Sequence, residues 1–272
     1  MSLSRRPPRF SPRACPGSPS RPPPRRHPPP PLRRPQQYSF GLTTFSPSGK
    51  LGQLDHAFKA VQQGALALGI RAVDGVVVAT EKRLPSTLAD PATVEKISRL
   101  SDGVGSCYAG LGPDSRVLVR RARRSAVQYS AVYGERAPVA QLVRDTAAVM
   151  QEFTQQGGVR PFGVSLLVAG ADAAGPQLYQ VDPSGAYFAW RASAIGRGAA
   201  QAKAFLEKRY SADLGLEDAV HTALLTLKEG FEGDLSGDVV EVGVVATQGP
   251  HAGAFRVLSG AEVDEYLAEV GA

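Results

Sequence analysis

Residues that could bind a metal ion or carry out acid–base chemistry are few and scattered in this sequence. The four histidines, His27, His56, His221 and His251, form no cluster, and the chain contains neither a CxxC nor an HExxH motif. Metal sites need ligands at spacings that let them converge on one ion. The sequence therefore predicts no metal site and no bound cofactor, and we expect His221 to be a surface residue or a satisfied core residue.

The two cysteines predict no special chemistry either. Cys15 and Cys107 cannot build a disulfide framework, which indicates a reducing compartment. Cys107 lies among small apolar residues in VGSCYAGL, so we expect a buried, unreactive thiol rather than a nucleophile.

Two short polar motifs at predicted helix starts could be binding sites, but each has a structural explanation. Gly196-Arg197-Gly198 could hold an anion on free backbone N–H groups, yet it lacks the third glycine and the lysine of the stronger phosphate motifs. Glu217 and Asp218 fall in the first turn of a predicted helix, where carboxylates stabilise the helix dipole. The chain has no GxSxG motif, so no Ser-His-Asp triad is nominated.

The positive charge of the chain is concentrated at its N-terminal end. Residues 1–37 contain nine arginines, no acidic residue and 13 of the 22 prolines. The remaining 235 residues carry 22 basic and 25 acidic side chains, a formal charge of −3 against +6 for the whole chain. A nucleic-acid-binding core would need a clustered basic face, so nucleic acid is not an expected partner.

The same change in composition predicts two regions. Residues 1–37 are expected to form a disordered Pro/Arg-rich extension with polyproline II character, and residues 38–272 one domain with a sizeable core. No stretch approaches the ~20 apolar residues of a membrane span, and no secretory signal is visible.

Three interpretations of the extension stay open. An arginine-rich, acid-free start resembles an organelle transit peptide. A basic, proline-rich run can also bind RNA or the proline-binding groove of a partner such as an SH3 domain. The extension could equally be without a function of its own.

Hydrophobic spacing predicts helices and strands in alternating blocks. The domain begins with a helix in which Leu51, Leu54, Phe58 and Val61 recur at helical spacing and Gly64 suits the helix end. Further helices are predicted from Gly112 to Gly134, from Pro138 to Gly157, over 199–210, over 216–229 and from Ala261. Strands are predicted over 66–72, 76–81, 104–111, 162–171, 177–181, 186–192, 239–247 and 254–258.

The order of these elements indicates an α+β fold. Strands occur in blocks rather than in strict βαβ alternation. Asp74-Gly75 predicts a tight hairpin, and Gly175-Pro176 and residues 182–185 are expected to be turns between strands. Apolar runs as long as 162–171 require cover on both faces, as in two stacked sheets with helices outside.

Several long motifs, in order along the chain, resemble the α-type subunits of the 20S proteasome. They are YSFGLTTFSPSGKLGQLDHAFKAV, GVVVATEKR, GGVRPFGVSLL, DPSGAYFAWRASAIGRG and FLEKRY, and they run from Tyr38 to the C-terminal helix. The Tyr-Ser-Phe start and the FGVSLL…DPSGAYFAW stretch are most similar to the alpha type-2 branch of that family. The resemblance implies a four-layer αββα sandwich of the N-terminal-nucleophile hydrolase type, placed in the outer ring of a barrel whose inner rings carry the protease.

The resemblance also implies that this chain is not itself an enzyme. Catalytic relatives use an N-terminal threonine as nucleophile, with its free amine as base. This chain has Gly64-Ala65 where those relatives have Gly-Thr, and the preceding helix leaves no free amine there. Glu81 and Lys96 align close to the acidic and lysine partners of the catalytic members, but they cannot perform acyl transfer without a nucleophile.

For the α-type family, the resemblance implies a gate and a docking pocket. The segment before the first helix closes the pore, and Tyr38 and Pro47 match the cluster that holds its open form. Ser39, before Phe40, replaces a commoner Asp, and His56 replaces a Tyr, which could make the open state sensitive to pH.

Lys96 and Gly64 match the pocket between neighbouring subunits, where an ammonium group can pair with an activator's C-terminal carboxylate. The resemblance implies neighbouring α-type and β-type subunits and regulatory particles as partners, ubiquitinated substrates reached indirectly, and a location in cytoplasm and nucleus. The structural alternative for Lys96 is a solvated lysine at a strand edge.

Two other function classes remain to be weighed. An active N-terminal-nucleophile hydrolase would need a processing site that exposes Thr, Ser or Cys before the first strand, and Ala65 argues against it. An adaptor that binds RNA or SH3 domains would act through residues 1–37 alone.

Overall fold

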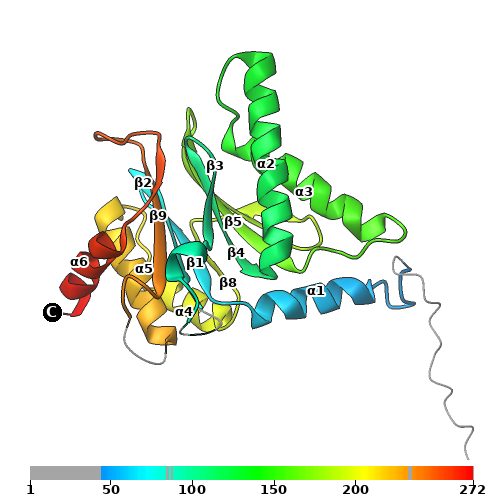
Figure 1. The fold of residues 1–272 in the computed structure, drawn as a ribbon, viewed down its shortest axis with the longest axis horizontal. Helices are drawn as coiled ribbons and strands as arrows, with labels where there is room; N and C mark the ends of the chain where they lie inside the picture. The colour runs from blue at the N-terminus through cyan, green and yellow to red at the C-terminus, as the bar shows by residue number, and fades with distance from the viewer. Residues whose placement is uncertain (1–43, 84–85, 87, 232–234, 272) are drawn as a thin grey trace, which may run out of the picture. The chain divides into compact units, whose positions relative to one another are not determined.

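The computed structural model describes residues 44–271, apart from 84–85, 87 and 232–234 (Figure 1). The predicted extension, together with Tyr38, Ser39 and Phe40, lies outside the described residues. The helices are α1 (Gly52–Gln63), α2 (Gly112–Tyr133), α3 (Val139–Gln155), α4 (Ala199–Arg209), α5 (Leu216–Gly230) and α6 (Gly260–Gly271). A 3₁₀ turn, Pro91–Thr93, precedes β3.

Ten strands of the described residues form two five-stranded antiparallel sheets. The first sheet has the order β10-β9-β2-β1-β8 and the second the order β3-β4-β5-β6-β7. The first consists of β1 (Ala67–Arg71), β2 (Gly75–Glu81), β8 (Ala192–Ile195), β9 (Val240–Ala246) and β10 (Phe255–Val257). The second consists of β3 (Ile97–Ser101), β4 (Val104–Gly110), β5 (Val164–Asp172), β6 (Gly175–Val181) and β7 (Tyr187–Ala189).

Alternate residues of each central strand point into different cores, which produces four layers. In β2, Val76 and Val78 enter the core between the two sheets, whereas Val77 and Ala79 face α4, α5 and α6. The second sheet alternates in the same way and buries its outer side against α2 and α3. This is the αββα sandwich that the resemblance implies, and the α2 and α3 layer lies on the opposite side of the sheets from α5 and α6 (Figure 1).

The predicted helices all form, with bounds within a few residues of those expected. The first hairpin is also confirmed: β1 and β2 pair antiparallel across the turn that contains Asp74. In α1, however, only Ala57 and Val61 are buried, and Phe58 is exposed although it shares the apolar spacing. Helical spacing identifies an apolar face, but only the tertiary structure shows how much of that face another element covers.

One predicted strand is two. The expected strand 186–192 contains β7, which pairs with β6 in the second sheet, and the start of β8, which pairs with β1 in the first. Trp190 and Arg191 connect the two sheets through backbone hydrogen bonds to Leu178 and Arg71. The two strands are separated only by Trp190 and a bend at Arg191, and sequence pattern alone does not show that the pairing partner changes there.

Two smaller expectations differ from the structure. Gly175 and Pro176 belong to β6 rather than to the turn before it, because they pair with Asp172 and Ala171 of β5. Strand β3, with Lys96 immediately before it, is absent from the predicted strands. It is an edge strand with exposed polar positions, so its sequence has weak strand character.

Candidate functional site

The position that aligns with a catalytic nucleophile is occupied by Ala65, between α1 and β1. Gly64 ends α1, and its N–H donates to the carbonyl oxygen of Val61. The carbonyl oxygen of Gly64 accepts a hydrogen bond from the backbone N–H of Arg197 at 2.9 Å. The chain thus continues from α1 into β1 without a hydroxyl or a free amine, the two groups that acyl transfer by this chemistry requires.

Four polar residues near this position form what we call the Lys96 cluster. Lys96, Glu81 and Cys107 are buried, and Glu241 is half-buried. Lys96 precedes β3, and its backbone N–H donates to Oε2 of Glu241 on β9 at 2.8 Å. Its ammonium group donates to the carbonyl oxygen of Tyr108 at 3.1 Å and lies 3.9 Å from the centre of the Tyr108 ring. Lys96 is therefore a buried, hydrogen-bonded residue and not the solvated lysine of the structural alternative.

Burial dominates the electrostatics of the Lys96 cluster. Loss of hydration lowers the pKa of Lys96 below its usual value, although the fields of Cys107, Glu241 and Glu81 oppose that shift. Burial likewise raises the pKa of Glu241, against the hydrogen bond from the Lys96 N–H. Burial raises the pKa of the Cys107 thiol to about 12, so this cysteine is the unreactive residue that its apolar neighbours predict.

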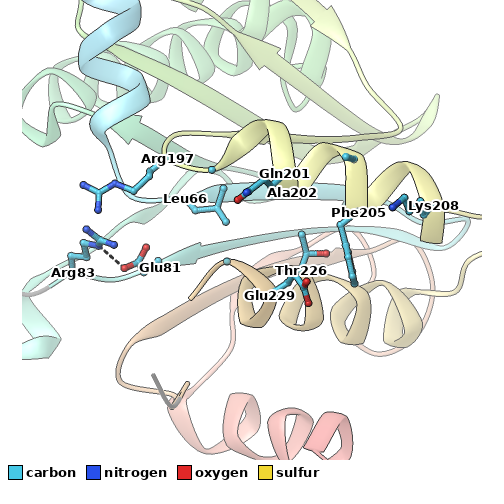
Figure 2. A pocket seen from close by; sticks show the side chains of 13 residues that line it. Leu66, Glu81, Arg83, Arg197, Gln201, Ala202, Phe205, Lys208, Thr226 and Glu229 are labelled. Atoms are coloured by element: carbon cyan, nitrogen blue, oxygen red, sulfur yellow. Dashed lines mark hydrogen bonds and ion pairs between the residues drawn. The ribbon is translucent and has the colours of Figure 1, made fainter. Parts of the chain in front are cut away.

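A cavity of about 460 Å³ opens beside the first turn of α4 (Figure 2). Glu81 and Arg83 form an ion pair at one end of it, and Arg197 lies nearby at the start of α4. Along α4 the lining becomes apolar at Ala202 and Phe205. Lys96 and Gly64 are not among the residues that line this cavity.

The Gly196-Arg197-Gly198 motif forms part of the connection between β8 and α4. Its two glycines have positive φ angles of 95° and 71°, and a Cβ on Gly196 would lie 2.5 Å from the carbonyl oxygen of Ala65. The glycines therefore allow a close passage of the backbone past the start of β1, which explains them without a phosphate ligand.

The remaining polar residues singled out from the sequence do not converge on a common site. Glu217 and Asp218 lie in the first turn of α5, as predicted. His221 bonds Glu269 of α6 at 2.8 Å through Nε2. His251 lies in the loop before β10, and within the described residues no group of His, Cys, Asp and Glu side chains could hold a metal ion.

Of the residues assigned to the gate, two fall within the described part of the chain. Pro47 is exposed in a turn closed by hydrogen bonds between Ser46 and Lys50. His56 is exposed on α1. Of the two pocket residues, Lys96 contacts Tyr108 and Gly64 packs against Gly110, so both touch the C-terminal end of β4.

Sequence reasoning missed two groups of buried charge. Glu241 could have been found, because it is a lone carboxylate in the apolar strand VVEVGVV. Asp114, in the first turn of α2, forms a bidentate ion pair with Arg160, 46 residues away. No local sequence pattern predicts that Asp114 pairs with Arg160.

None of the helices within the described ranges is long and apolar enough to cross a membrane. The proteasome subunit family matches residues 61–245, and the N-terminal signature of A-type proteasome subunits matches residues 38–60. The proteasome alpha type-2-B subunit of Arabidopsis thaliana is 62% identical over 234 residues, which covers 86% of this chain and 98% of the relative.

Similar relatives occur in other eukaryotes. The proteasome alpha type-2 subunit of Oryza sativa subsp. japonica is 60% identical over 86% of this chain and 98% of its own length. That of Dictyostelium discoideum is 55% identical over 85% of this chain and 97% of its own length. From these matches and the αββα sandwich, the chain belongs to the proteasome subunit family, as an α-type subunit of the 20S core particle.

Proposed function

We propose that this chain is a non-catalytic subunit of the α-ring, which helps to assemble the ring, to close the substrate pore and to dock regulatory particles in ubiquitin-dependent protein degradation. The observation that carries the non-catalytic assignment is the continuous backbone through Val61, Gly64 and Ala65. A nucleophile and a free amine are both missing there, and the nearby lysine is hydrogen-bonded to the carbonyl oxygen of Tyr108. The active-hydrolase alternative has no support at this position.

Unburied apolar side chains near the N-terminal end of the described domain support a role in ring assembly. Phe45 is 62% exposed and Phe58 36% exposed, and both lie on or next to α1. Neighbouring subunits would remove such apolar surface from water. The test is sedimentation of a gentle lysate: the chain should run only in a very large particle that has peptidase activity. A free monomer of tens of kilodaltons would contradict the ring assignment.

The gate proposal assigns residues 38–47, which precede α1, to the segment that closes the pore. Tyr38, Ser39, Phe40 and Pro47 would form its contacts, with His56 in place of an aromatic hydroxyl. Replacement His56→Tyr would restore the aromatic hydroxyl and should raise activator-stimulated peptide hydrolysis by the assembled core. Unchanged hydrolysis would contradict the role of His56.

The docking proposal assigns Lys96 and Gly64 to a pocket for the C-terminal carboxylate of an activator. The Lys96 ammonium group donates to the carbonyl oxygen of Tyr108, near the C-terminal end of β4. Gly64 packs on the backbone of Ala109 and Gly110 at the same end. Replacement Lys96→Ala should reduce activator-stimulated hydrolysis without preventing ring incorporation, because the charge that attracts the carboxylate is lost. Lys228→Ala, an exposed lysine of α5, is the control. Full stimulation of the Lys96→Ala particle would rule out the pocket.

The proposed partners are thus other α-type and β-type subunits, the C-terminal tails of regulatory particles and, indirectly, ubiquitinated substrates. The proposed location is cytoplasm and nucleus. Because residues 1–37 are not expected to contribute to the core, their removal should leave ring incorporation unchanged. Loss of incorporation after this truncation would show that the extension has a structural role.

A further inference from the structure

The cavity of about 460 Å³ beside the first turn of α4 has a positively charged end (Figure 2). Arg83, two residues after β2, and Arg197, just before α4, both line this end. Glu81 forms an ion pair with Arg83 at 2.5 Å. Within the described ranges, the guanidinium of Arg197 has no such partner. One carboxylate thus serves two guanidinium groups, which leaves this end with one positive charge in excess.

The backbone fixes the position of Arg197 at the mouth of α4. Its N–H donates to the carbonyl oxygen of Gly64 at 2.9 Å, and Gly196 and Gly198 on either side of it adopt positive φ angles. The first turn of α4 contains no acidic side chain, and no side chain caps the helix. A ligand at this end would therefore have to order only the arginine side chains, which keeps the cost of binding low.

The rest of the cavity offers apolar surface next to this charge. Leu66 and Ala202 are buried and Phe205 is half-buried, and all three line the cavity. Farther along, Lys208 and Glu229 contribute one charge of each sign, so this part adds no net charge. Small-molecule sites commonly have this size and this character, mostly apolar with a few polar groups that fix the orientation of the ligand.

We propose that this cavity binds a small monocarboxylate with an apolar body. The carboxylate would lie between Arg83 and Arg197, because a planar guanidinium group can donate two parallel N–H bonds to it. The apolar body would lie against Phe205. One excess positive charge matches one negative charge, so a monoanion fits this end better than a phosphate monoester does. None of the residues assigned to the gate or to the docking pocket lines this cavity, so the inference is independent of both proposals.

The test uses octanoate as the probe and assembled core particles that contain this chain. Equilibrium dialysis with radiolabelled ligands should show binding of octanoate. Acetate, which lacks the apolar body, and octan-1-ol, which lacks the charge, should each bind about tenfold more weakly. Octyl phosphate, with a charge of about −1.5 to −2 at pH 7, should also bind more weakly than octanoate. Equal binding of octan-1-ol and octanoate would overturn the proposal, because the arginines would then play no part.

Substitutions of the two arginines, with a matched control, connect this binding to the cavity. Arg83→Met and Arg197→Met should each weaken octanoate binding by about tenfold, because each removes charge-assisted hydrogen bonds to the carboxylate. Arg197→Lys keeps the charge but not the two parallel donors, so its loss should be smaller. Arg144→Met removes the same charge from an exposed position on α3 and should leave binding unchanged. Equal losses in all three Met variants would assign binding to overall charge and overturn the site.

The charge balance of the site has its own test in Glu81→Gln. This change removes the carboxylate that pairs with Arg83, so the excess charge at this end rises from one to two. The affinity for octyl phosphate relative to octanoate should then increase by about tenfold. An unchanged preference between the two ligands would overturn the assignment of a monocarboxylate.

Photocrosslinking locates the probe without any substitution. An octanoate analogue with a photoreactive diazirine at the end of its alkyl chain should label residues within 201–208 or 226–230 of the wild-type chain, as detected by mass spectrometry. Excess octanoate should prevent this labelling. Labelling confined to other parts of this chain or to other subunits would overturn the proposal, whether or not the variant chains assemble into particles.

Discussion

The Lys96 cluster contacts strand β4 at Tyr108, and the stacked backbones of Gly64, Gly110 and Gly163 meet its C-terminal end. We call these three glycines, with the Asp114–Arg160 ion pair, the α1 seat; it differs from the cluster in almost every property. The cluster holds the residue types that perform catalysis, a lysine, two carboxylates and a thiol; Lys96, Glu81 and Cys107 are buried and Glu241 is half-buried. The seat is built mainly from glycine backbones and one ion pair. The comparison teaches that reactive residue types do not make an active site without a nucleophile, whereas residues without reactive groups can bring distant parts of the backbone into direct contact.

The largest effect is expected from a side chain added to the seat. Gly64→Ala should lower the free energy of unfolding by about 3 kcal/mol, because its Cβ would collide with backbone rather than with a flexible side chain. Gly52→Ala is the control in the same helix. A Cβ there meets nothing within 4 Å, so that change should be neutral or slightly stabilising. Chemical denaturation of both variants checks this, and equal effects would remove the distinction between seat and helix.

A smaller effect is expected from the Lys96 cluster. Lys96→Met should change the free energy of unfolding at pH 7 by less than about 1 kcal/mol, because the lost hydrogen bond is offset by the lost cost of burying a charge. The lowered pKa of Lys96 means that the wild type loses stability as pH falls from 10.5 through the pKa in the folded state. The Met variant lacks this dependence, so the stability of the wild type relative to the Met variant should rise between pH 7 and 10 in denaturation curves. Parallel curves would show that Lys96 is not desolvated.

The ion pair between Arg256 and Glu262 should contribute less again to the free energy of unfolding. Arg256 and Ser259 hold the pKa of Glu262 at about 2, below its usual 4.5. The stabilisation is therefore present above pH 4.5 and is lost as pH falls toward about 2. Glu262→Gln should cause a small loss of stability at neutral pH and flatten the acid limb of the stability profile. An unaltered acid limb would show that Glu262 does not form this pair in solution.

No effect on activity is expected from restoring the missing hydroxyl alone. Ala65→Thr supplies a hydroxyl between α1 and β1, but the peptide bond to Gly64 still removes the free amine. The purified variant chain should therefore not hydrolyse the peptide substrates or form an adduct with an electrophilic inhibitor. Adduct formation at residue 65, detected by mass spectrometry, would return the Lys96 cluster to the class of active sites.

The sequence by itself determined the helices, most of the strands and the arrangement of two stacked sheets with helices outside. Helical spacing, Gly64 after α1 and the Asp74-Gly75 turn predicted the helices and the first hairpin because those features depend on neighbours in the chain. The long motifs predicted the family, and the absence of a hydroxyl at residue 65 follows from the sequence directly. The apolar surroundings of Cys107 were enough to predict an unreactive thiol.

Only the tertiary structure decided which distant residues meet. Long-range contacts decide where the chain changes sheet, between β7 and β8. They also decide that Lys96 is buried beside Glu241 and that Phe58 is exposed. The seat is the clearest case, since Gly64, Gly110 and Gly163 look like ordinary glycines in three separate motifs. Their function arises because backbone can approach backbone there only when no Cβ intervenes, and no local pattern encodes which backbones those are.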